Sequence, residues 1–321
     1  MSQTPKRILL IKLGSLGDIF LILGVIRDLA EFSGTKIDVL TQGAYAKVFK
    51  RSPDVAQVHI DNRLSRLNLG YLLSLRKTFQ DGSYDLIVDF QNSKRTAFYR
   101  RWLAPNVSWC QLGTLSPSEF SSDQTDSPVL AKFQHQLTAF GIKATNLIEG
   151  SLDWLCETSS ASERVKFSKK SVVLLPGASA RHKHKIWPHY NDLAERLIEQ
   201  GIDVFVVPGP DDMEQCKTIS GELLLNDGNW LNFFQLAGVL KEANFVVGND
   251  SGPTHLAASL GTPGAALFGE RTAQYASNMQ RKKMVAYIAS ELSDISVEKI
   301  STVINEICRL TSDKNSYQRL A

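Results

Sequence analysis

The chain has 321 residues, which suggests two domains of ordinary size, each able to bury its own core. Its hydrophobic content of 43% and charged content of 21% are ordinary for a soluble globular protein, and no apolar run is long enough to span a bilayer. The four cysteines have no paired spacing, which argues against a disulfide framework and a cysteine-based zinc site, so a cytoplasmic protein is expected.

The net charge of +3 is unevenly distributed along the chain. Residues 1–155 hold 18 basic and 14 acidic side chains, whereas residues 156–321 hold 18 and 19. Within residues 50–101 there are ten basic side chains and five acidic ones. This excess is either a solvated basic face or a sign that the N-terminal half binds an anionic partner. No nucleic-acid partner is expected.

In the N-terminal half, short apolar runs alternate with helical patterns, which predicts a parallel sheet. Strands are predicted at 8–11, 37–40, 58–60 and 84–90, and helices at 19–32, 71–79, 95–103 and 129–140. Residues 116–127 are polar and are predicted to form a loop.

Residues 157–170 are rich in small polar side chains and are interpreted as a linker. A second alternation follows, with strands predicted at 171–175, 204–207, 245–247 and 265–268, and helices at 189–200, 233–240, 254–260 and 297–310. We therefore expect two Rossmann-like α/β domains that face each other. Their predicted bounds are 1–160 and 161–295, and a helix with a polar tail occupies 296–321.

Three polar loops follow strands of the C-terminal half, at 176–185, 208–214 and 248–255. Ligands of parallel α/β sheets bind at this edge. In the first loop, Lys185 or Arg181 could neutralise a diphosphate.

The other two loops could bind a sugar and a ribose. Asp211, Asp212 or Glu214 could accept hydrogen bonds from ribose hydroxyls.

The first of the three loops also contains two histidines. His182 and His184 suggest a metal, but the lysines beside them argue otherwise, so no metal site is predicted.

The loop at 248–255 leads into a helix whose free N–H groups favour an anion. Asp250 could accept hydrogen bonds from sugar hydroxyls. Alternatively, Asp250 and Ser251 only cap the helix, and His255 is a packed helix residue.

Asp18 lies where the first strand gives way to a helix. A carboxylate there is commonly structural, but it could also act as a general base. The surrounding turn lacks the dinucleotide pattern GxGxxG, which disfavours a hydride-transfer enzyme, and the chain contains no P-loop and no GxSxG.

Four segments of the chain together resemble the lipopolysaccharide heptosyltransferases of glycosyltransferase family 9. They are KLGSLGD at 12–18, DFQ with KR at 89–95, PGAS through KIWP at 176–188, and NDSGPTH at 249–255. The last segment is the most specific, and the combination is far more specific than any one segment.

This resemblance implies a GT-B fold, in which two Rossmann-like domains with parallel sheets face each other across a cleft. It implies inverting transfer of a heptose from ADP-heptose, bound mainly by the second domain, to the lipid A–Kdo inner core. No cofactor is expected. The basic excess of residues 50–101 suits an anionic glycolipid acceptor of this type, met in the cytoplasm or at the cytoplasmic face of the inner membrane.

The resemblance also assigns roles to individual residues. Asp18 is the expected catalytic base, Asp250 holds the sugar, and the acid that binds ribose stays open among Asp211, Asp212 and Glu214. The donor site is expected to comprise Ser179, Ala180, Arg181, Lys185, Asp211, Glu214, Asp250, Ser251, Gly252 and His255. The acceptor site is expected to comprise Lys12, Gln91, Lys94 and Arg95. The proline that the family often has soon after the base is missing from residues 19–24, which leaves the acceptor contacts open.

Two alternatives remain at this stage. The protein could be a family member that uses another sugar nucleotide to build a different surface glycan. It could instead be a non-catalytic nucleotide-sugar binding protein, against which the presence of Asp18, Lys185 and Asp250 argues.

Overall fold

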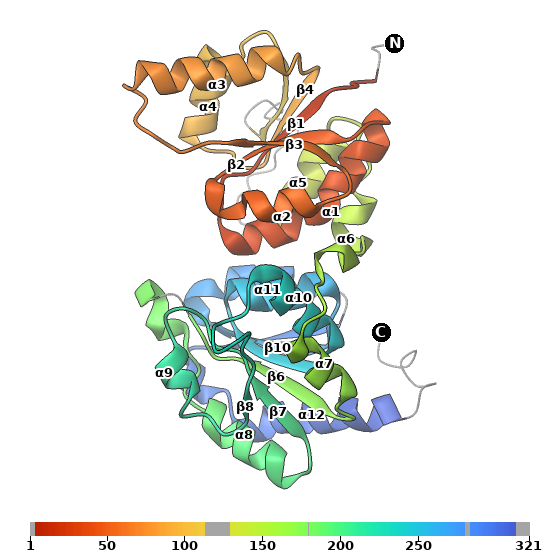
Figure 1. Cartoon of the computed structure of the whole chain (residues 1–321), viewed down its shortest axis with the longest axis vertical. Coiled ribbons are helices and arrows are strands. Elements are labelled where there is room, and N and C mark those ends of the chain that lie inside the picture. The colour runs from red at the N-terminus through yellow and green to blue at the C-terminus, as the bar shows by residue number, and fades with distance from the viewer. Residues whose placement is uncertain (1–3, 113–128, 179, 280–282, 313–321) are drawn as a thin grey trace. The chain divides into compact units, whose positions relative to one another are not determined.

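The structure is a computed structural model that describes residues 4–112, 129–178, 180–279 and 283–312. The chain divides into two compact units between Trp154 and Leu155, called unit 1 and unit 2 below (Figure 1). Each unit is built around one sheet whose paired strands are parallel. The predicted α/β class with two parallel-sheet domains is therefore confirmed.

The sheet of unit 1 has the strand order β3-β2-β1-β4-β5. Its strands are β1 (Ile8–Ile11), β2 (Ile37–Thr41), β3 (Val55–Ile60), β4 (Leu86–Asp89) and β5 (Ser108–Cys110). The chain reverses its direction of winding between β1 and β4, which makes the carboxyl ends of these two strands a topological switch point. All four residues of β1 are buried, as expected for a strand covered on both faces.

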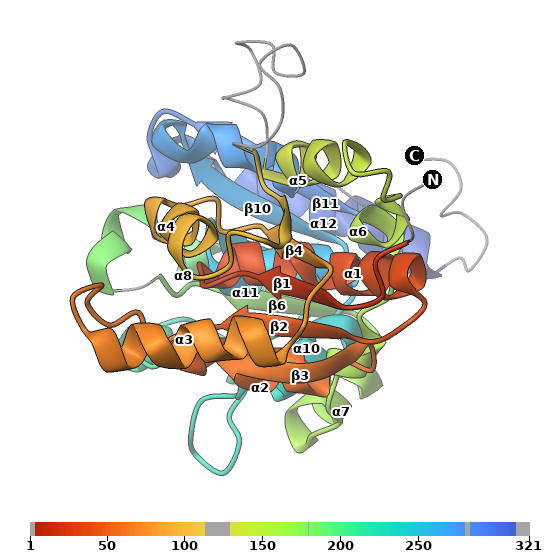
Figure 2. The same cartoon turned by 90° about the horizontal axis from the view of Figure 1, so that it is seen from above.

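Helices cover both faces of the unit 1 sheet. They are α1 (Leu16–Ser33), α2 (Ala46–Arg51), α3 (Leu69–Asp81), α4 (Lys94–Trp102), α5 (Val129–Thr138) and α6 (Thr145–Glu149). Helices α3 and α4 lie on one face, and α1 and α2 lie on the other (Figures 1 and 2). Leu75 and Phe79 of α3 pack with Tyr99 of α4 over the sheet in one buried cluster. The loop predicted at 116–127 lies outside the described residues.

The sheet of unit 2 has the strand order β11-β10-β9-β6-β7-β8. Its strands are β6 (Ser171–Leu175), β7 (Asp203–Val206), β8 (Glu222–Leu223), β9 (Phe245–Asn249), β10 (Gly264–Gly269) and β11 (Met284–Ala289). Here the winding reverses between β6 and β9, so the loops after these strands share the switch point of unit 2.

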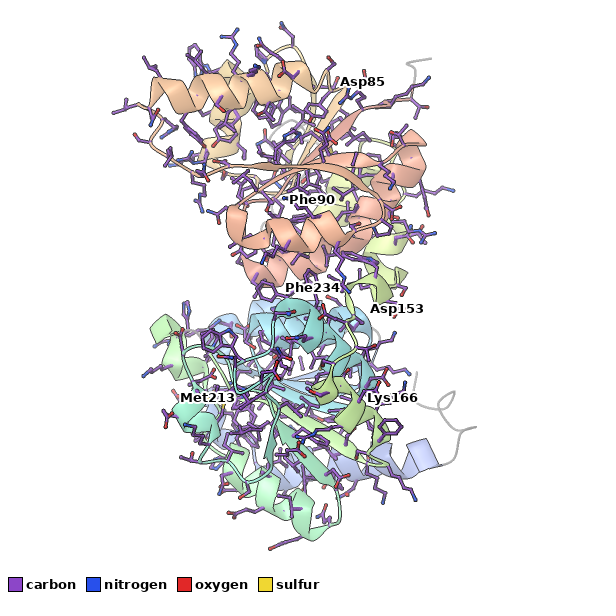
Figure 3. The ribbon with its side chains drawn as sticks, viewed as in Figure 1. Asp85, Phe90, Asp153, Lys166, Met213 and Phe234 are labelled. Carbon is purple, nitrogen blue, oxygen red and sulfur yellow. The ribbon has the colours of Figure 1, made fainter. Side chains whose placement is uncertain are left out.

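The helices of unit 2 include all four that the sequence predicted, together with two shorter ones. They are α7 (Ser160–Phe167), α8 (Tyr190–Glu199), α9 (Met213–Cys216), α10 (Phe233–Glu242), α11 (Gly252–Leu260) and α12 (Val297–Ser312). Lys166 marks α7 and Met213 marks α9 in Figure 3.

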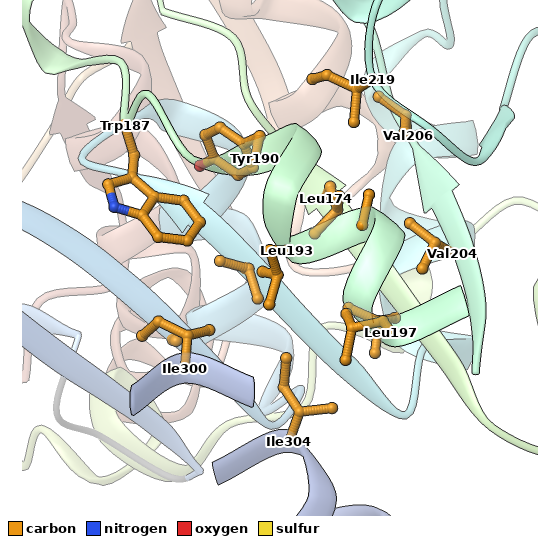
Figure 4. Packing of buried hydrophobic residues seen from close by; sticks show 14 of the residues in the cluster. Leu174, Trp187, Tyr190, Leu193, Leu197, Val204, Val206, Ile219, Ile300 and Ile304 are labelled. Atoms are coloured by element: carbon orange, nitrogen blue, oxygen red, sulfur yellow. The ribbon is translucent and has the colours of Figure 1, made fainter. Parts of the chain in front are cut away.

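The core of unit 2 joins α8 and α12 to the sheet. Leu193 and Leu197 of α8 lie in one buried cluster with Ile300 and Ile304 of α12 (Figure 4). Trp187, which is also buried in this cluster, donates its indole N–H to the carbonyl of Ile295 over 2.9 Å. The C-terminal helix α12 therefore contributes to the core of unit 2.

The interpretation of residues 157–170 as a linker is wrong, because this segment contains α7. Ser159 and Ser162 form a capping box at the start of the helix, in which each side chain accepts the other's backbone N–H. Ala161 and Val165 are buried, and the helix packs against α10. Small polar residues that looked like a flexible linker serve here as helix caps.

A helix that crosses a bilayer must be both long and apolar. Among the described residues, no helix meets both requirements.

Candidate active site

The turn after β1 brings two opposite charges together. Lys12 directly follows β1, and its Nζ donates to Asp18 Oδ2 over 2.8 Å and to the carbonyl of Phe90 over 3.3 Å. Asp18 lies in the first turn of α1, where the helix dipole favours a carboxylate. The Lys12 side chain is 4% exposed and that of Asp18 is 32% exposed. A buried ammonium thus holds a carboxylate that reaches solvent.

A hydrogen bond from the turn after β1 to the turn after β4 holds the two turns together. Gln91 Oε1 accepts the backbone N–H of Leu13 over 2.9 Å. The carboxylate of Asp89 accepts the backbone N–H groups of Gln91 and Asn92 over 2.9 and 3.1 Å. Gln111 donates its Nε2 to the other oxygen of Asp89 over 2.6 Å. Hydrogen bonds therefore lock together the two loops that flank the switch point of unit 1 (Phe90 is labelled in Figure 3).

Asp89 is a supporting carboxylate that has no access to solvent. Burial raises the pKa of Asp89 to about 6, and hydrogen bonds from Thr96, Asn92, Gln91 and Gln111 offset only part of this effect. Since it is enclosed, Asp89 shapes the turn and does not contact a ligand directly.

The four residues expected to bind the acceptor have different environments. Lys12 and Gln91 are engaged with Asp18 and with the backbone of Leu13, as described above. The guanidinium of Arg95 donates to two tyrosine hydroxyls and to two backbone carbonyls. Lys94, at the start of α4, is exposed.

In unit 2, Asp250 forms the centre of a charged group. Lys185 Nζ donates to Asp250 Oδ2 over 2.6 Å, and His255 Nε2 lies 3.6 Å from Asp250 Oδ1. Burial disfavours the Asp250 carboxylate, but hydrogen bonds from His255 and Lys185, together with their charges, hold its pKa below the usual range. Lys185 follows β6 and Asp250 follows β9, so both lie at the switch point of unit 2.

Asn249, the last residue of β9, holds this arrangement and was missed by the sequence analysis. Its Oδ1 accepts the backbone N–H of Trp187 over 3.0 Å and the hydroxyl of Tyr190 over 3.1 Å. Its Nδ2 donates to the carbonyl of Pro176 over 2.8 Å. One fully buried amide thus joins the loop after β6 to the loop after β9.

The loop after β9 leads into α11 with its first amides directed at the switch point. Ser251 is the N-cap residue, and its Oγ lies 3.1 Å from Thr254 Oγ1 without capping a backbone N–H. Gly252 begins the helix. Within the part of the chain that the structure describes, the buried Nδ1 of His255 has no hydrogen-bond partner. The helix start therefore offers N–H donors to an anion.

The loop after β7 contains the three acids expected near ribose. Asp211 is exposed, and Glu214 is also exposed and pairs with Lys217 over 2.7 Å. Asp212 is buried and accepts the backbone N–H of Gly209, so it stabilises the loop. Its carboxylate also lies against Gly177, where an added Cβ would come within 1.8 Å of Asp212 Oδ2.

Three further residues expected in the donor site belong to the loop after β6. Ser179 lies outside the described residues. Ala180 and Arg181 belong to the 3-10 helix η6 (Ala180–Lys185), whose backbone is described there without the positions of these two side chains.

The sequence model of glycosyltransferase family 9 (heptosyltransferase) matches residues 72–302, which is more than half of the chain. The chain belongs to glycosyltransferase family 9. The matched range of this glycosyltransferase includes the turn after β4 and the loops after β6, β7 and β9, and it begins after Asp18.

Curated relatives of this family 9 glycosyltransferase cover most of its length. Lipopolysaccharide heptosyltransferase 1 of Pseudomonas aeruginosa is 27% identical over 291 residues, which is 82% of this chain and 78% of the relative. Lipooligosaccharide heptosyltransferase 2 of Haemophilus influenzae is 24% identical, over 79% of this chain and 80% of the relative.

Solved structures show that the glycosyltransferase has the predicted GT-B fold. A family 9 glycosyl transferase from Veillonella parvula superposes with a TM-score of 0.75 at 16% identity, over 95% of this chain and 97% of that one. The heptosyltransferase WaaC of E. coli, solved with ADP-2-deoxy-2-fluoro heptose, gives a TM-score of 0.68 at 19% identity, over 94% and 99%.

The described residues of the glycosyltransferase contain no group of three or more His, Cys, Asp or Glu side chains that could hold a metal ion. His182 and His184 lie with their ring centroids 5.9 Å apart and tilted to each other.

Proposed function

We propose that this glycosyltransferase moves a heptose from ADP-heptose to the lipid A–Kdo inner core of lipopolysaccharide, with inversion at the anomeric carbon. The observation that carries the proposal is the group formed by Lys185, Asp250 and the start of α11 at the switch point of unit 2. A cation and free helix amides suit a diphosphate, and a carboxylate suits sugar hydroxyls. The heptosyltransferase names of the relatives, and the fluoro-heptose nucleotide bound by the E. coli protein, support heptose as the sugar.

In the proposed reaction, Asp18 removes the proton from an acceptor hydroxyl as its oxygen attacks the anomeric carbon. The bond between this carbon and the diphosphate oxygen breaks, and ADP leaves with the electron pair. A single displacement on the opposite face of the sugar inverts the configuration. Lys12 orients the base through its 2.8 Å contact with Asp18.

Lys185 stabilises the departing ADP in this proposal. Without donor, its ammonium is neutralised by Asp250. A diphosphate would attract the ammonium and free an oxygen of Asp250 for a sugar hydroxyl. Together with the first amides of α11, Lys185 supplies positive charge where the leaving group develops negative charge, so no metal ion is required in this mechanism.

The acceptor in this proposal is an anionic glycolipid. Residues 50–101 of unit 1 contain twice as many basic as acidic side chains, and the exposed Lys94 is one of them. A phosphorylated and carboxylated lipid of the Kdo–lipid A type matches this charge. The enzyme would meet it at the cytoplasmic face of the inner membrane.

A thermal-shift titration with nucleotides and nucleotide sugars tests the donor. ADP and ADP-heptose should stabilise the protein by about 2.7 kcal/mol at a concentration 100 times the dissociation constant, and UDP- or GDP-sugars should have little effect.

Lys185→Ala should weaken ADP binding roughly ten- to hundredfold, because charge-assisted hydrogen bonds contribute about 1.5–3 kcal/mol. Lys183→Ala, in the same loop and exposed, is the matched control.

Transfer is then measured with ADP-heptose and a Kdo–lipid A acceptor, with and without EDTA. Heptosylated product in both samples is the expected result. Stabilisation by UDP- or GDP-sugars without any effect of ADP would contradict the proposed donor, although the family assignment would stand.

A further inference from the structure

The loop after β3 and the outer side of α3 expose several large apolar side chains. Leu67 is 90% exposed, Leu69 73% and Leu73 65%. Leu69 and Leu73 are four residues apart on α3 and therefore project from the same side of the helix. Single exposed leucines are ordinary on protein surfaces, but a contiguous group marks a site of interaction.

All charged residues of the same segment are basic. Residues 62–80 contain Arg63, Arg66, Arg76 and Lys77, and no Asp or Glu. All four basic residues are exposed. On α3, Arg76 and Lys77 continue the side of the helix that presents Leu69 and Leu73. Apolar side chains flanked by cations are complementary to a partner that has an apolar interior beneath an anionic surface.

A buried network at its base holds the loop in place. The carboxylate of Asp61 accepts the hydroxyl of Tyr99 over 2.8 Å, the backbone N–H of Arg63 over 2.7 Å and the hydroxyl of Tyr71. Arg95 donates to the carbonyls of Arg63 and Leu64 over 3.1 and 2.9 Å. The leucines are therefore presented by a braced loop and a helix.

The position of the loop within unit 1 relates this surface to Asp18. All strands of the sheet are parallel, so the loop after β3 leaves the same edge as the turn after β1 that leads to Asp18. The segment also contacts α4, because Arg66 stacks on the ring of Phe98 with 5.4 Å between its guanidinium carbon and the ring centroid. A lipid surface that covers the loop would thus lie at the edge where the proposed base is found.

We propose that Arg63, Leu67, Leu69, Leu73, Arg76 and Lys77 form a membrane-docking surface that binds an anionic phospholipid bilayer. The leucines enter the boundary between headgroups and acyl chains, and the cations contact lipid phosphates. This inference rests on the proposed function, because a glycolipid acceptor is held in a bilayer.

Flotation of the full-length protein with lipid vesicles tests the docking surface. The wild-type protein should float with vesicles of phosphatidylethanolamine and phosphatidylglycerol, and much less with vesicles of phosphatidylcholine alone. Raising the salt from about 0.1 M to about 0.5 M should reduce binding, since the cations act through screened charge interactions.

Two double variants separate the apolar and the charged contributions. Leu67→Ser with Leu69→Ser should weaken binding to the anionic vesicles by at least about tenfold. Arg76→Gln with Lys77→Gln should weaken it by about fivefold for each cation removed. The matched controls are in unit 2: Phe167→Ser with Ile198→Ser, which are exposed apolar residues, and Lys166→Gln with Lys169→Gln, which are exposed cations. The controls should bind vesicles as the wild type does.

Vesicle binding needs no sugar donor, so the two proposals can fail separately. Equal binding by wild type and by both docking variants, or no binding by the wild type, overturns the docking surface even if heptose transfer is observed. A wild-type dimer that becomes a monomer on Leu67→Ser with Leu69→Ser, without vesicle binding, shows that a second copy covers this surface and also overturns the proposal. Vesicle binding without heptose transfer contradicts the proposed function and leaves the docking surface standing.

Discussion

At the scale of single residues, the contact with Lys12 distinguishes Asp18 from an ordinary aspartate at a helix start. Asp192 occupies the first turn of α8 and is a useful comparison, because its side chain is 63% exposed and pairs with His189 at the surface. Asp18 instead meets an almost fully buried ammonium that is also bonded to the backbone after β4. Such a bond fixes the direction of a carboxylate, which a catalytic base requires.

Replacing Asp18 by Asn keeps the size of the side chain and removes the base. For Asp18→Asn we expect kcat to fall by about 10²–10⁴, while ADP affinity measured by calorimetry stays unchanged because the proposed donor loops belong to unit 2. Asp192→Asn is the matched control and should turn over normally. If Asp18 only assists the helix start, Asp18→Asn should cost about 1 kcal/mol or less and leave turnover nearly intact, which would remove it from the mechanism.

Asp89 predicts a pH dependence of stability. Its pKa in the folded protein is about 6, above its ordinary value of 3.8, so the native state holds this proton more tightly than the unfolded state. The resulting stabilisation is present below the ordinary pKa and is lost as the pH rises through 6, a change of about 3 kcal/mol. Asp89→Asn lacks this titration.

Urea unfolding of wild type and Asp89→Asn at about pH 4 and about pH 7 measures this effect. The free energy of unfolding of the variant minus that of the wild type should increase by about 2–3 kcal/mol between the two pH values. Contributions of the other carboxyl groups cancel in this difference. A difference that stays constant with pH would show that Asp89 ionises normally despite its burial.

At the scale of elements, α12 illustrates how an amphipathic helix completes a core. Ile300 and Ile304 have no exposed surface, whereas Thr302 lies on the outer side of the helix. Ile304→Ala should lower the free energy of unfolding by about 2–5 kcal/mol through lost burial and a residual cavity. Thr302→Ala, two residues earlier and on the opposite side of the helix, should change it by about 0.5 kcal/mol or less. Chemical denaturation measures the free energy of unfolding of both variants. If both substitutions change it equally little, α12 detaches readily from the core.

Elements with a strong apolar pattern could be predicted from the sequence, and short ones could not. The strand predicted at 171–175 has the observed bounds, and the helix predicted at 71–79 is observed as Leu69–Asp81. β5 and α2 were missed, because three and six residues are too few for a periodicity to appear. β5 is specified by its pairing with β4, a contact between segments far apart in the sequence.

The same limit applies to the candidate site. The loops that contain Asp18, Lys185 and Asp250 could be found because they follow recognisable strands. The supporting contacts could not, because Asn249 joins loops that are 73 residues apart at Pro176. Arg95 looked like a free cation in the sequence, whereas its guanidinium is bonded to side chains and carbonyls from the loop after β3 and from α3 and α4.

At the scale of the whole molecule, both units use the same arrangement of inner strands. In each, the winding reverses beside the first strand, and the charged residues of the candidate site follow the two strands at that point. The edge strand β8, which has only two residues, lies away from this point. The fold thus explains why the chemically interesting residues fall in only a few short stretches of the sequence.

Each sheet is also built from one uninterrupted stretch of chain, because the units divide between Trp154 and Leu155. On the ribosome, all five strands of unit 1 are therefore synthesised before the first strand of unit 2. At about 5–20 residues per second, synthesis of residues 155–321 takes on the order of ten to thirty seconds. The half that contains Asp18 and the exposed leucines thus has time to fold on the nascent chain before synthesis of the half that contains Lys185 and Asp250 is finished.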